Sequence, residues 1–207
     1  MIEAVCFNIS SLIESKVEKI AFTVALPLIM AMKKNTSLSD AQRILREKIG
    51  ELSRSHASFY YSLESLSKAI DIDYNLLLDL YEYLSRSYVV KAEYSEDILK
   101  NLRLRGIKNI VFTRSDPTID EIKLTAVGLR IHIDYLISLP ELFGMMRTRS
   151  VFEKLANHLV KMEITRSREN IVIISPELGD YIDAMDAGLK AIWLSKQGEI
   201  RVEHQIF

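Results

Sequence analysis

The chain has 207 residues, 48% of them hydrophobic, which is enough for one domain, or for a core domain with a smaller inserted one. Its formal net charge of −1 shows no excess of either sign, so we expect neither a nucleic acid nor a membrane surface as a partner. The one cysteine, Cys6, excludes an intrachain disulfide and fits a reducing compartment. We see no signal peptide and no apolar run long enough to span a bilayer, and therefore expect a cytoplasmic protein.

The first predicted element is a strand at Ala4–Phe7, an apolar run that stops at the polar cluster Asn8-Ile9-Ser10-Ser11. From about Ile13 to Val90 the apolar spacing is helical, and no strand-like alternation is found. The first helix there should be kinked by Pro27. Its expected apolar stripe consists of Val17, Ile20, Val24, Leu28 and Met32. The next helix is capped by Ser37 or Ser39, and two more run near 59–70 and 74–84.

The second half of the chain alternates predicted helices with predicted strands. The strands are "KNIVFTRS", "IDYLIS", "ENIVIISP" and "KAIWLSK", and the tail "EIRVEHQIF" is compatible with an edge strand. Such alternation is typical of parallel strands joined by right-handed crossovers. The strands read as continuous apolar runs, which indicates a sheet covered on both faces.

The sequence therefore predicts an α/β fold, with a Rossmann-like three-layer core around a parallel sheet and an inserted all-α cap. The core is expected at 1–14 and 94–207, and the cap at 15–93.

Ligands bind outside the carboxyl ends of the strands in open α/β sheets, so the residues after each strand are the candidates for a site. They are Asn8, Ser10 and Ser11, then Thr113, Arg114 and Ser115, then Ser138, and finally Ser175, Pro176, Glu177 and Asp180. These side chains are hydroxyls, one amide, one arginine and a few carboxylates, and together they resemble a phosphate or small-anion pocket that is poor in catalytic groups. The alternative that these are ordinary loop residues without a function stays open, because loops after strands are polar in every α/β protein.

The order of elements resembles the haloacid dehalogenase-like (HAD) superfamily, in the form with a helical cap inserted after the first strand. The resemblance covers 1–15 and 93–198, whereas the cap matches in position and helical character only. The family has Asp-x-Asp-Gly-Thr after the first strand. Its first Asp is the nucleophile that forms an aspartyl-phosphate, and its second is the acid/base. The matching positions here are Asn8 and Ser10.

The other family motifs are kept only in part. Thr113 matches the Thr or Ser that hydrogen-bonds the phosphoryl oxygens. The family lysine corresponds to Met146 or to Arg147, depending on a one-residue gap, and Arg147 would keep its positive charge. Two family acids help to hold Mg²⁺, and Ser175 replaces the first of them while Asp180 keeps the second.

These departures imply that phosphatase or dehalogenase chemistry has been lost. Covalent phosphoryl transfer needs a carboxylate nucleophile, which Asn8 does not supply. No cofactor is expected, beyond weak Mg²⁺ binding at Asp180. The resemblance then implies a non-catalytic binding or interaction protein with an anion pocket from Thr113, Arg114 and Arg147. The alternative is a hydrolase with altered chemistry that uses Asp180.

The expected partners are a small anion or phosphorylated ligand, and a protein partner or a second copy bound through the cap. The second expectation depends on tyrosines in the cap segment: Tyr60, Tyr61, Tyr74, Tyr81, Tyr83 and Tyr88. Aromatic helical surfaces suit protein contacts. The alternative is that these side chains pack the core of the cap.

Overall fold

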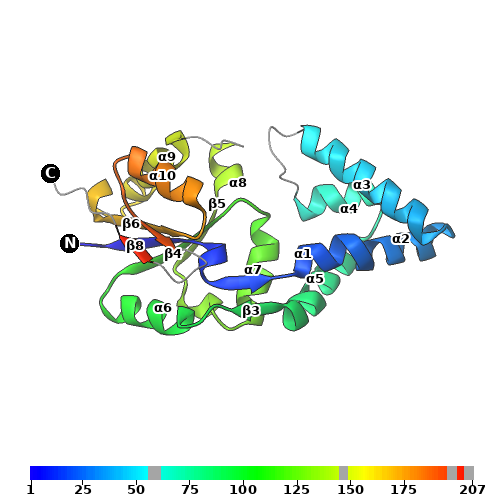
Figure 1. Cartoon of the computed structure of the whole chain (residues 1–207), viewed down its shortest axis with the longest axis horizontal. Coiled ribbons are helices and arrows are strands. Elements are labelled where there is room, and N and C mark those ends of the chain that lie inside the picture. The colour runs from blue at the N-terminus through cyan, green and yellow to red at the C-terminus, as the bar shows by residue number, and fades with distance from the viewer. Residues whose placement is uncertain (56–61, 145–148, 195–199, 203–207) are drawn as a thin grey trace. The chain divides into compact units, whose positions relative to one another are not determined.

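The computed structural model describes residues 1–55, 62–144, 149–194 and 200–202. The chain separates into two compact units (Figure 1). The sheet unit consists of Met1–Ile13, Lys91–Arg114 and Leu129–Phe207, and the helical unit of Glu14–Val90 and Ser115–Gly128. The helical unit therefore includes a segment outside the expected cap range of 15–93, and the expected cap boundaries stay a prediction.

The sheet unit contains six strands in the order β5-β4-β1-β6-β7-β8. The strands are β1 (Ala4–Asn8), β4 (Lys108–Thr113), β5 (Tyr135–Ser138), β6 (Ile171–Ser175), β7 (Lys190–Leu194) and β8 (Ile200–Val202). The first five are parallel, and β8 pairs antiparallel with β7 at the edge. The predicted α/β fold with a parallel sheet is confirmed, and so is an edge strand in the tail.

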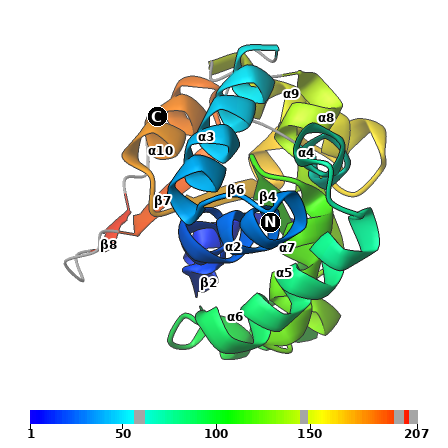
Figure 2. The same ribbon diagram turned by 90° about the vertical axis from the view of Figure 1, so that its right-hand side faces the viewer.

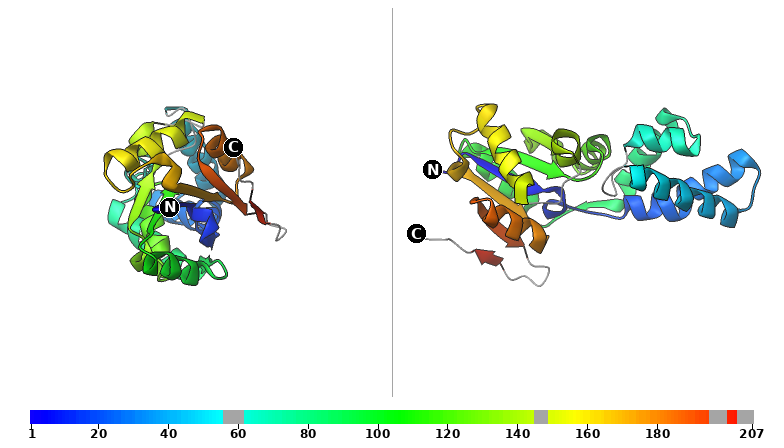
Figure 3. Two further views of the ribbon diagram at one scale, coloured as in Figure 1. Left: turned by 90° about the vertical axis from the view of Figure 1, so that its left-hand side faces the viewer. Right: turned by 90° about the horizontal axis from the view of Figure 1, so that it is seen from above.

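Helices cover both faces of this sheet. They are α6 (Ser95–Leu104), α8 (Leu139–Phe143), α9 (Arg149–Lys161) and α10 (Leu178–Asp186). Figure 3 shows α9 and α10 on one face and α6 on the other. Alternate residues of β1 and β4, including Cys6 and Phe112, join the buried cluster under α9 and α10. Phe112 meets Phe152 of α9 edge to face, with ring centroids 5.5 Å apart. Each such ring stabilises the fold by roughly 1.5–3 kcal/mol through burial.

Cys6 belongs to this core rather than to a reactive site. Its side chain is fully buried in β1, and burial raises the pKa of its thiol. A thiolate, which is the nucleophilic form, is therefore disfavoured at neutral pH.

The helical unit contains α1 (Val17–Ile20), the π-helical turn η2 (Ala21–Ala25), α2 (Leu26–Lys34), α3 (Leu38–Ser55), α4 (Leu63–Ile70), α5 (Tyr74–Tyr88) and α7 (Pro117–Ala126). Figure 2 shows α2 beside α3, and α5 beside α7, in agreement with the contacts between these helices. Ser37 caps α3 as predicted, because its Oγ accepts the Asp40 N–H at 3.1 Å. None of the helices described is both long and apolar enough to cross a membrane.

The expected apolar stripe on the first helix is correct at Val17, which is buried, but wrong from Val24 onward. Val24, Leu28 and Met32 are 56%, 50% and 76% exposed, and the buried face continues through Ala21, Leu26 and Met30 instead. The turn η2 explains the difference, because a π-helical turn adds one residue and shifts every later side chain to a new face.

Pro27 gives this turn a local cause. Proline has no N–H to donate to the carbonyl four residues before it, which belongs to Thr23. The Gln42 side chain of α3 donates to that Thr23 oxygen instead, at 3.2 Å. The helix therefore changes its winding just before Pro27, and α2 begins with the proline in its first turn.

The expectation of no strand between Ile13 and Val90 is also wrong at its two ends. β2 (Ile13–Ser15) and β3 (Val89–Lys91) form a two-stranded sheet. Each has three residues, which is too short for the alternation by which a strand is recognised in a sequence.

A buried ion cluster joins α1 to α7 within the helical unit. The Lys123 ammonium lies 2.9 Å from Asp120 Oδ1 and also pairs with Glu18 of α1, while Ser115 Oγ donates to Asp120 Oδ2. Burial acts to lower the pKa of Lys123, but the carboxylates of Asp120 and Glu18 together outweigh it and raise that pKa. Lys123 is therefore charged at neutral pH, as its two acidic partners require.

Candidate functional site

Four of the described strands of the sheet unit end in polar residues at the same edge. β1 ends at Asn8, β4 at Thr113, β6 at Ser175 and β5, beside β4, at the buried Ser138. The strands are parallel and in register, with Phe7 opposite both Val111 and Ile174. The structure therefore places these predicted site residues together, and all four side chains are buried.

Asp180 is at the centre of this group. It lies in the first turn of α10, where the helix dipole favours a negative charge. Its Oδ2 accepts the Asn8 Nδ2–H at 2.8 Å and the Ser175 Oγ–H at 2.8 Å. Its Oδ1 accepts Arg114 Nη2–H at 2.5 Å. The carboxylate is only 2% exposed, so these three donors replace most of its water.

The neighbours of Asp180 are fixed by bonds of their own. Asn8 Oδ1 accepts the Ser10 N–H at 3.0 Å and caps the 3-10 helix η1 (Ile9–Ser11). Ser175 Oγ accepts the Glu177 N–H at 3.0 Å. Because a carboxylate only accepts and a backbone N–H only donates, these partners determine which way the Asn8 amide points.

The other predicted residues have different positions. Ser10 is exposed, and Ser11 Oγ donates to the Ile174 carbonyl of β6 at 3.2 Å. Arg114 also lies 3.8 Å from Glu177 Oε2, and its side chain is 25% exposed. Met146 and Arg147 lie outside the described residues, so the expected contribution of Arg147 stays a prediction.

Sequence reasoning missed the pairing of Arg114 with Asp180. It assigned the arginine to a ligand and the aspartate to a metal, although the structure joins the two directly. One signal was available. Arg114 directly follows β4, and Asp180 lies on the helix that follows β6. These two strands flank β1 on either side, so the segments after them meet in front of Asn8.

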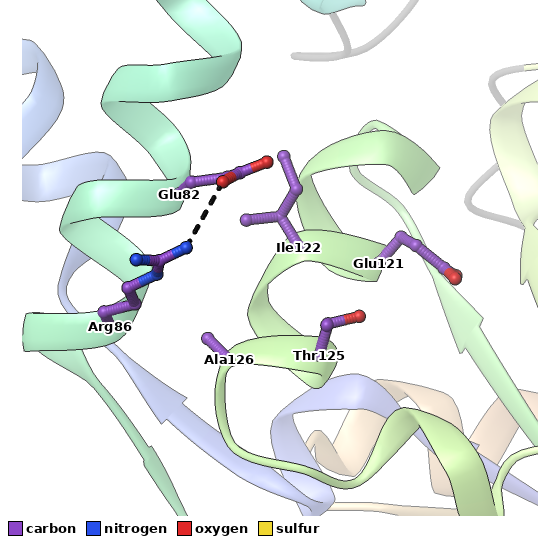
Figure 4. A pocket seen from close by; sticks show the side chains of 6 residues that line it. All are labelled: Glu82, Arg86, Glu121, Ile122, Thr125 and Ala126. Carbon is purple, nitrogen blue, oxygen red and sulfur yellow. Dashed lines mark ion pairs between the residues drawn. The ribbon is translucent and has the colours of Figure 1, made fainter.

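A separate pocket of about 240 Å³ lies within the helical unit, between α5 and α7. Figure 4 shows Arg86 beside Glu82, with which it pairs at 3.6 Å, and Glu121 on the other side. Two carboxylates against one guanidinium disfavour an anion there. Arg114 at the strand ends also faces two carboxylates, those of Asp180 and Glu177, so the charge balance does not separate the two places and the expected anion pocket stays a prediction.

The tyrosines of the expected cap surface divide into two groups. Tyr81 is fully buried in the helical unit, whereas Tyr83 and Tyr88 are 69% and 41% exposed. Tyr60 and Tyr61 lie outside the described residues. Core packing accounts for Tyr81, and the protein-partner role of the remaining tyrosines stays a prediction.

Comparisons with known proteins define the class of fold. Neither a protein-family model nor a curated protein sequence matches the chain. Solved structures do match. A HAD phosphatase from Thermococcus onnurineus is similar with a TM-score of 0.66 and 20% identity, over 96% of this chain and 88% of that one. The chain thus has the HAD-like fold, as the resemblance in its sequence implied.

Two further similar structures are a dehalogenase and a predicted phosphatase. An L-2-haloacid dehalogenase from Xanthobacter autotrophicus, with chloropropionic acid covalently bound, has a TM-score of 0.56 and 17% identity, over 96% of this chain and 80% of that one. A predicted phosphoglycolate phosphatase from Haemophilus somnus has a TM-score of 0.59 and 15% identity, over 94% and 85%. At these identities the similarity shows the fold alone.

Proposed function

We propose that this chain is a HAD-fold protein without phosphatase or dehalogenase chemistry, and that it acts as a binding or interaction protein. The ligand would be a small anion or a phosphorylated molecule, bound beside Arg114 at the strand ends. The observation that carries the proposal is the complete engagement of Asp180, whose two oxygens accept hydrogen bonds from Asn8, Ser175 and Arg114.

The chemistry of the strand ends supports the loss of turnover. A covalent intermediate requires a carboxylate at the end of β1, and Asn8 offers a neutral amide whose oxygen and nitrogen both have partners. Asp180 is bonded directly to Asn8, but its carboxylate is only 2% exposed and three donors surround it, so a substrate would have to displace them to reach it. Ser10 lacks a group that titrates near neutral pH.

The donors at the same edge support anion binding. Arg114 carries five N–H groups in a planar fork, of which one bonds to Asp180 at 2.5 Å. Its side chain is 25% exposed, so part of the fork faces solvent. Planar N–H pairs of this kind suit the oxygens of phosphate and carboxylate groups.

We expect the wild type to show no turnover above background on a panel of phosphomonoesters with Mg²⁺ present. The variant Asn8→Asp/Ser10→Asp/Ser175→Asp restores the acids of the family pattern, and we expect it to exceed the wild type by at least about 10²-fold, the gain of one well-placed acid/base. The measurement is release of inorganic phosphate at neutral pH.

The alternative hydrolase that uses Asp180 makes the opposite prediction. It requires wild-type turnover that disappears in Asp180→Asn and survives in Asp186→Asn, the matched change at an exposed position of the same helix. That result would overturn the proposal.

Inorganic phosphate is the probe for binding. At a concentration tenfold above its dissociation constant, a ligand that binds only the folded state stabilises it by about 1.4 kcal/mol. We expect phosphate to raise the midpoint of urea unfolding relative to chloride at equal ionic strength, and to lose most of this effect in Arg114→Lys, which keeps the charge but not the planar fork. Equal stabilisation of both proteins would count against a pocket that includes Arg114.

A further inference from the structure

The position that would hold a divalent cation in this fold has a donor set that does not suit one. In the family that the sequence resembles, the residue matching Asp180 helps to hold Mg²⁺ together with a second acid, which is Ser175 here. Mg²⁺ requires near-octahedral coordination by oxygen lone pairs at about 2.0–2.1 Å. The question is therefore which oxygens at this place have lone pairs to offer.

Each oxygen around Asp180 is already used by a hydrogen-bond donor. Asp180 Oδ2 accepts from Asn8 and Ser175, and Asp180 Oδ1 accepts from Arg114. Asn8 Oδ1 accepts from Ser10 N–H, and Ser175 Oγ accepts from Glu177 N–H. Asn8 and Ser175 thus direct hydrogens, not lone pairs, toward the carboxylate. Asp180 Oδ2 thus has both lone pairs in use, and a metal ion at the other three oxygens would compete with their present donors.

The charge at this place is already balanced. The Arg114 guanidinium supplies a positive charge 2.5 Å from the Asp180 carboxylate, at the distance of a strong charge-assisted hydrogen bond. Glu177 also lies 3.8 Å from Arg114, so the charge balanced here is that of Asp180. Among the described residues, moreover, no group of three or more Asp, Glu, His or Cys side chains could hold a metal ion.

We propose that Arg114 is a built-in replacement for the divalent cation, and that the side-chain cluster around Asp180 is independent of divalent metals. The guanidinium compensates the charge of Asp180 and holds the segment after β4 against α10. This assignment concerns the cation alone and is independent of the proposed loss of turnover. Metal binding could be found in a protein without turnover, and turnover could be found in a protein that binds no metal.

Mn²⁺ is the probe, because its free ion is measured directly by electron paramagnetic resonance. We expect the wild type and Asp180→Asn to take up Mn²⁺ equally weakly, with no site below the millimolar range. Wild-type binding in the micromolar range that falls at least about tenfold in Asp180→Asn would overturn the proposal.

A second pair of variants tests the place of Arg114 itself. Asn8→Asp/Ser10→Asp/Ser175→Asp is compared with the same variant carrying Arg114→Asn. We expect the one without the guanidinium to bind Mn²⁺ at least about tenfold more tightly, because a like charge is removed. Equal affinities in two folded proteins would contradict the assignment. If circular dichroism shows that either is unfolded, the comparison of wild type with Asp180→Asn decides by itself.

Discussion

Replacing Arg114 by methionine is expected to lower the free energy of unfolding by about 2–4 kcal/mol. The substitution leaves the Asp180 carboxylate, 2% exposed, without its cation. Breaking a buried ion pair by removing one partner costs about 3–5 kcal/mol, and the 25% exposure of the arginine lets water recover part of that. Urea unfolding at neutral pH, followed by circular dichroism, measures the change.

The matched control is Arg43→Met on α3. Arg43 pairs with Glu47 at 2.9 Å, but both side chains are more than half exposed. Exposed pairs of this kind contribute about 0.3–0.5 kcal/mol, so the control should change little. The double variant Arg114→Met/Asp180→Asn removes the uncompensated charge and should recover much of the loss. A cost at Arg114 no larger than that at Arg43 would mean that Asp180 does not depend on it.

Replacing Lys123 by methionine should destabilise the helical unit by about 3–5 kcal/mol. The lysine side chain is 6% exposed and Asp120 is fully buried, so the substitution leaves a carboxylate without a cation and with almost no water. Its partner Glu18, which is 35% exposed, is affected less. The measurement is urea unfolding, with the transition of the helical unit assigned from hydrogen exchange in α1 and α7.

The pH dependence of this variant follows from the raised pKa of Lys123. A group whose folded pKa lies above its unfolded one stabilises the fold fully below the unfolded value, and that contribution is lost as pH rises through the folded value. The difference between wild type and Lys123→Met should therefore be constant near neutral pH and shrink only above about pH 10.

Lys68→Met on α4 serves as the control for Lys123. Lys68 pairs with Glu64 at 2.6 Å, with both side chains about 70% exposed. If the two lysine variants lose equal stability, burial is not the source of the effect.

β1, β4, β5 and β6 could be predicted from the sequence because each is a continuous apolar run, such as Ile110–Phe112, that ends in a polar residue. That rule also located the candidate site, since Asn8, Thr113 and Ser175 are the last residues of their strands. The pairing of Arg114 with Asp180 could not be predicted in the same way. It joins side chains 66 positions apart, and no local pattern encodes which donor reaches which carboxylate.

The error on the first helix has a different physical origin. A periodic pattern assumes constant winding, and the π-helical turn at Ala21–Ala25 breaks that assumption by one residue. Both registers of that segment are apolar, so the sequence permits either face to be buried. Packing against α3 and the Gln42 bond to Thr23 select the one that is observed.

The hydrogen bonds around Asp180 also bear on how such a site could change over evolutionary time. Asn8→Asp alone would place a second carboxylate in contact with Asp180 Oδ2, in place of a donor now 2.8 Å away, and Ser175→Asp alone would do the same from β6. Each single step toward the acidic pattern brings like charges together and is therefore unfavourable by itself. The steps become tolerable only when several acids and a metal ion arrive together. Under the proposed replacement of the metal by Arg114, a return to the acidic pattern one residue at a time is therefore disfavoured at every single step.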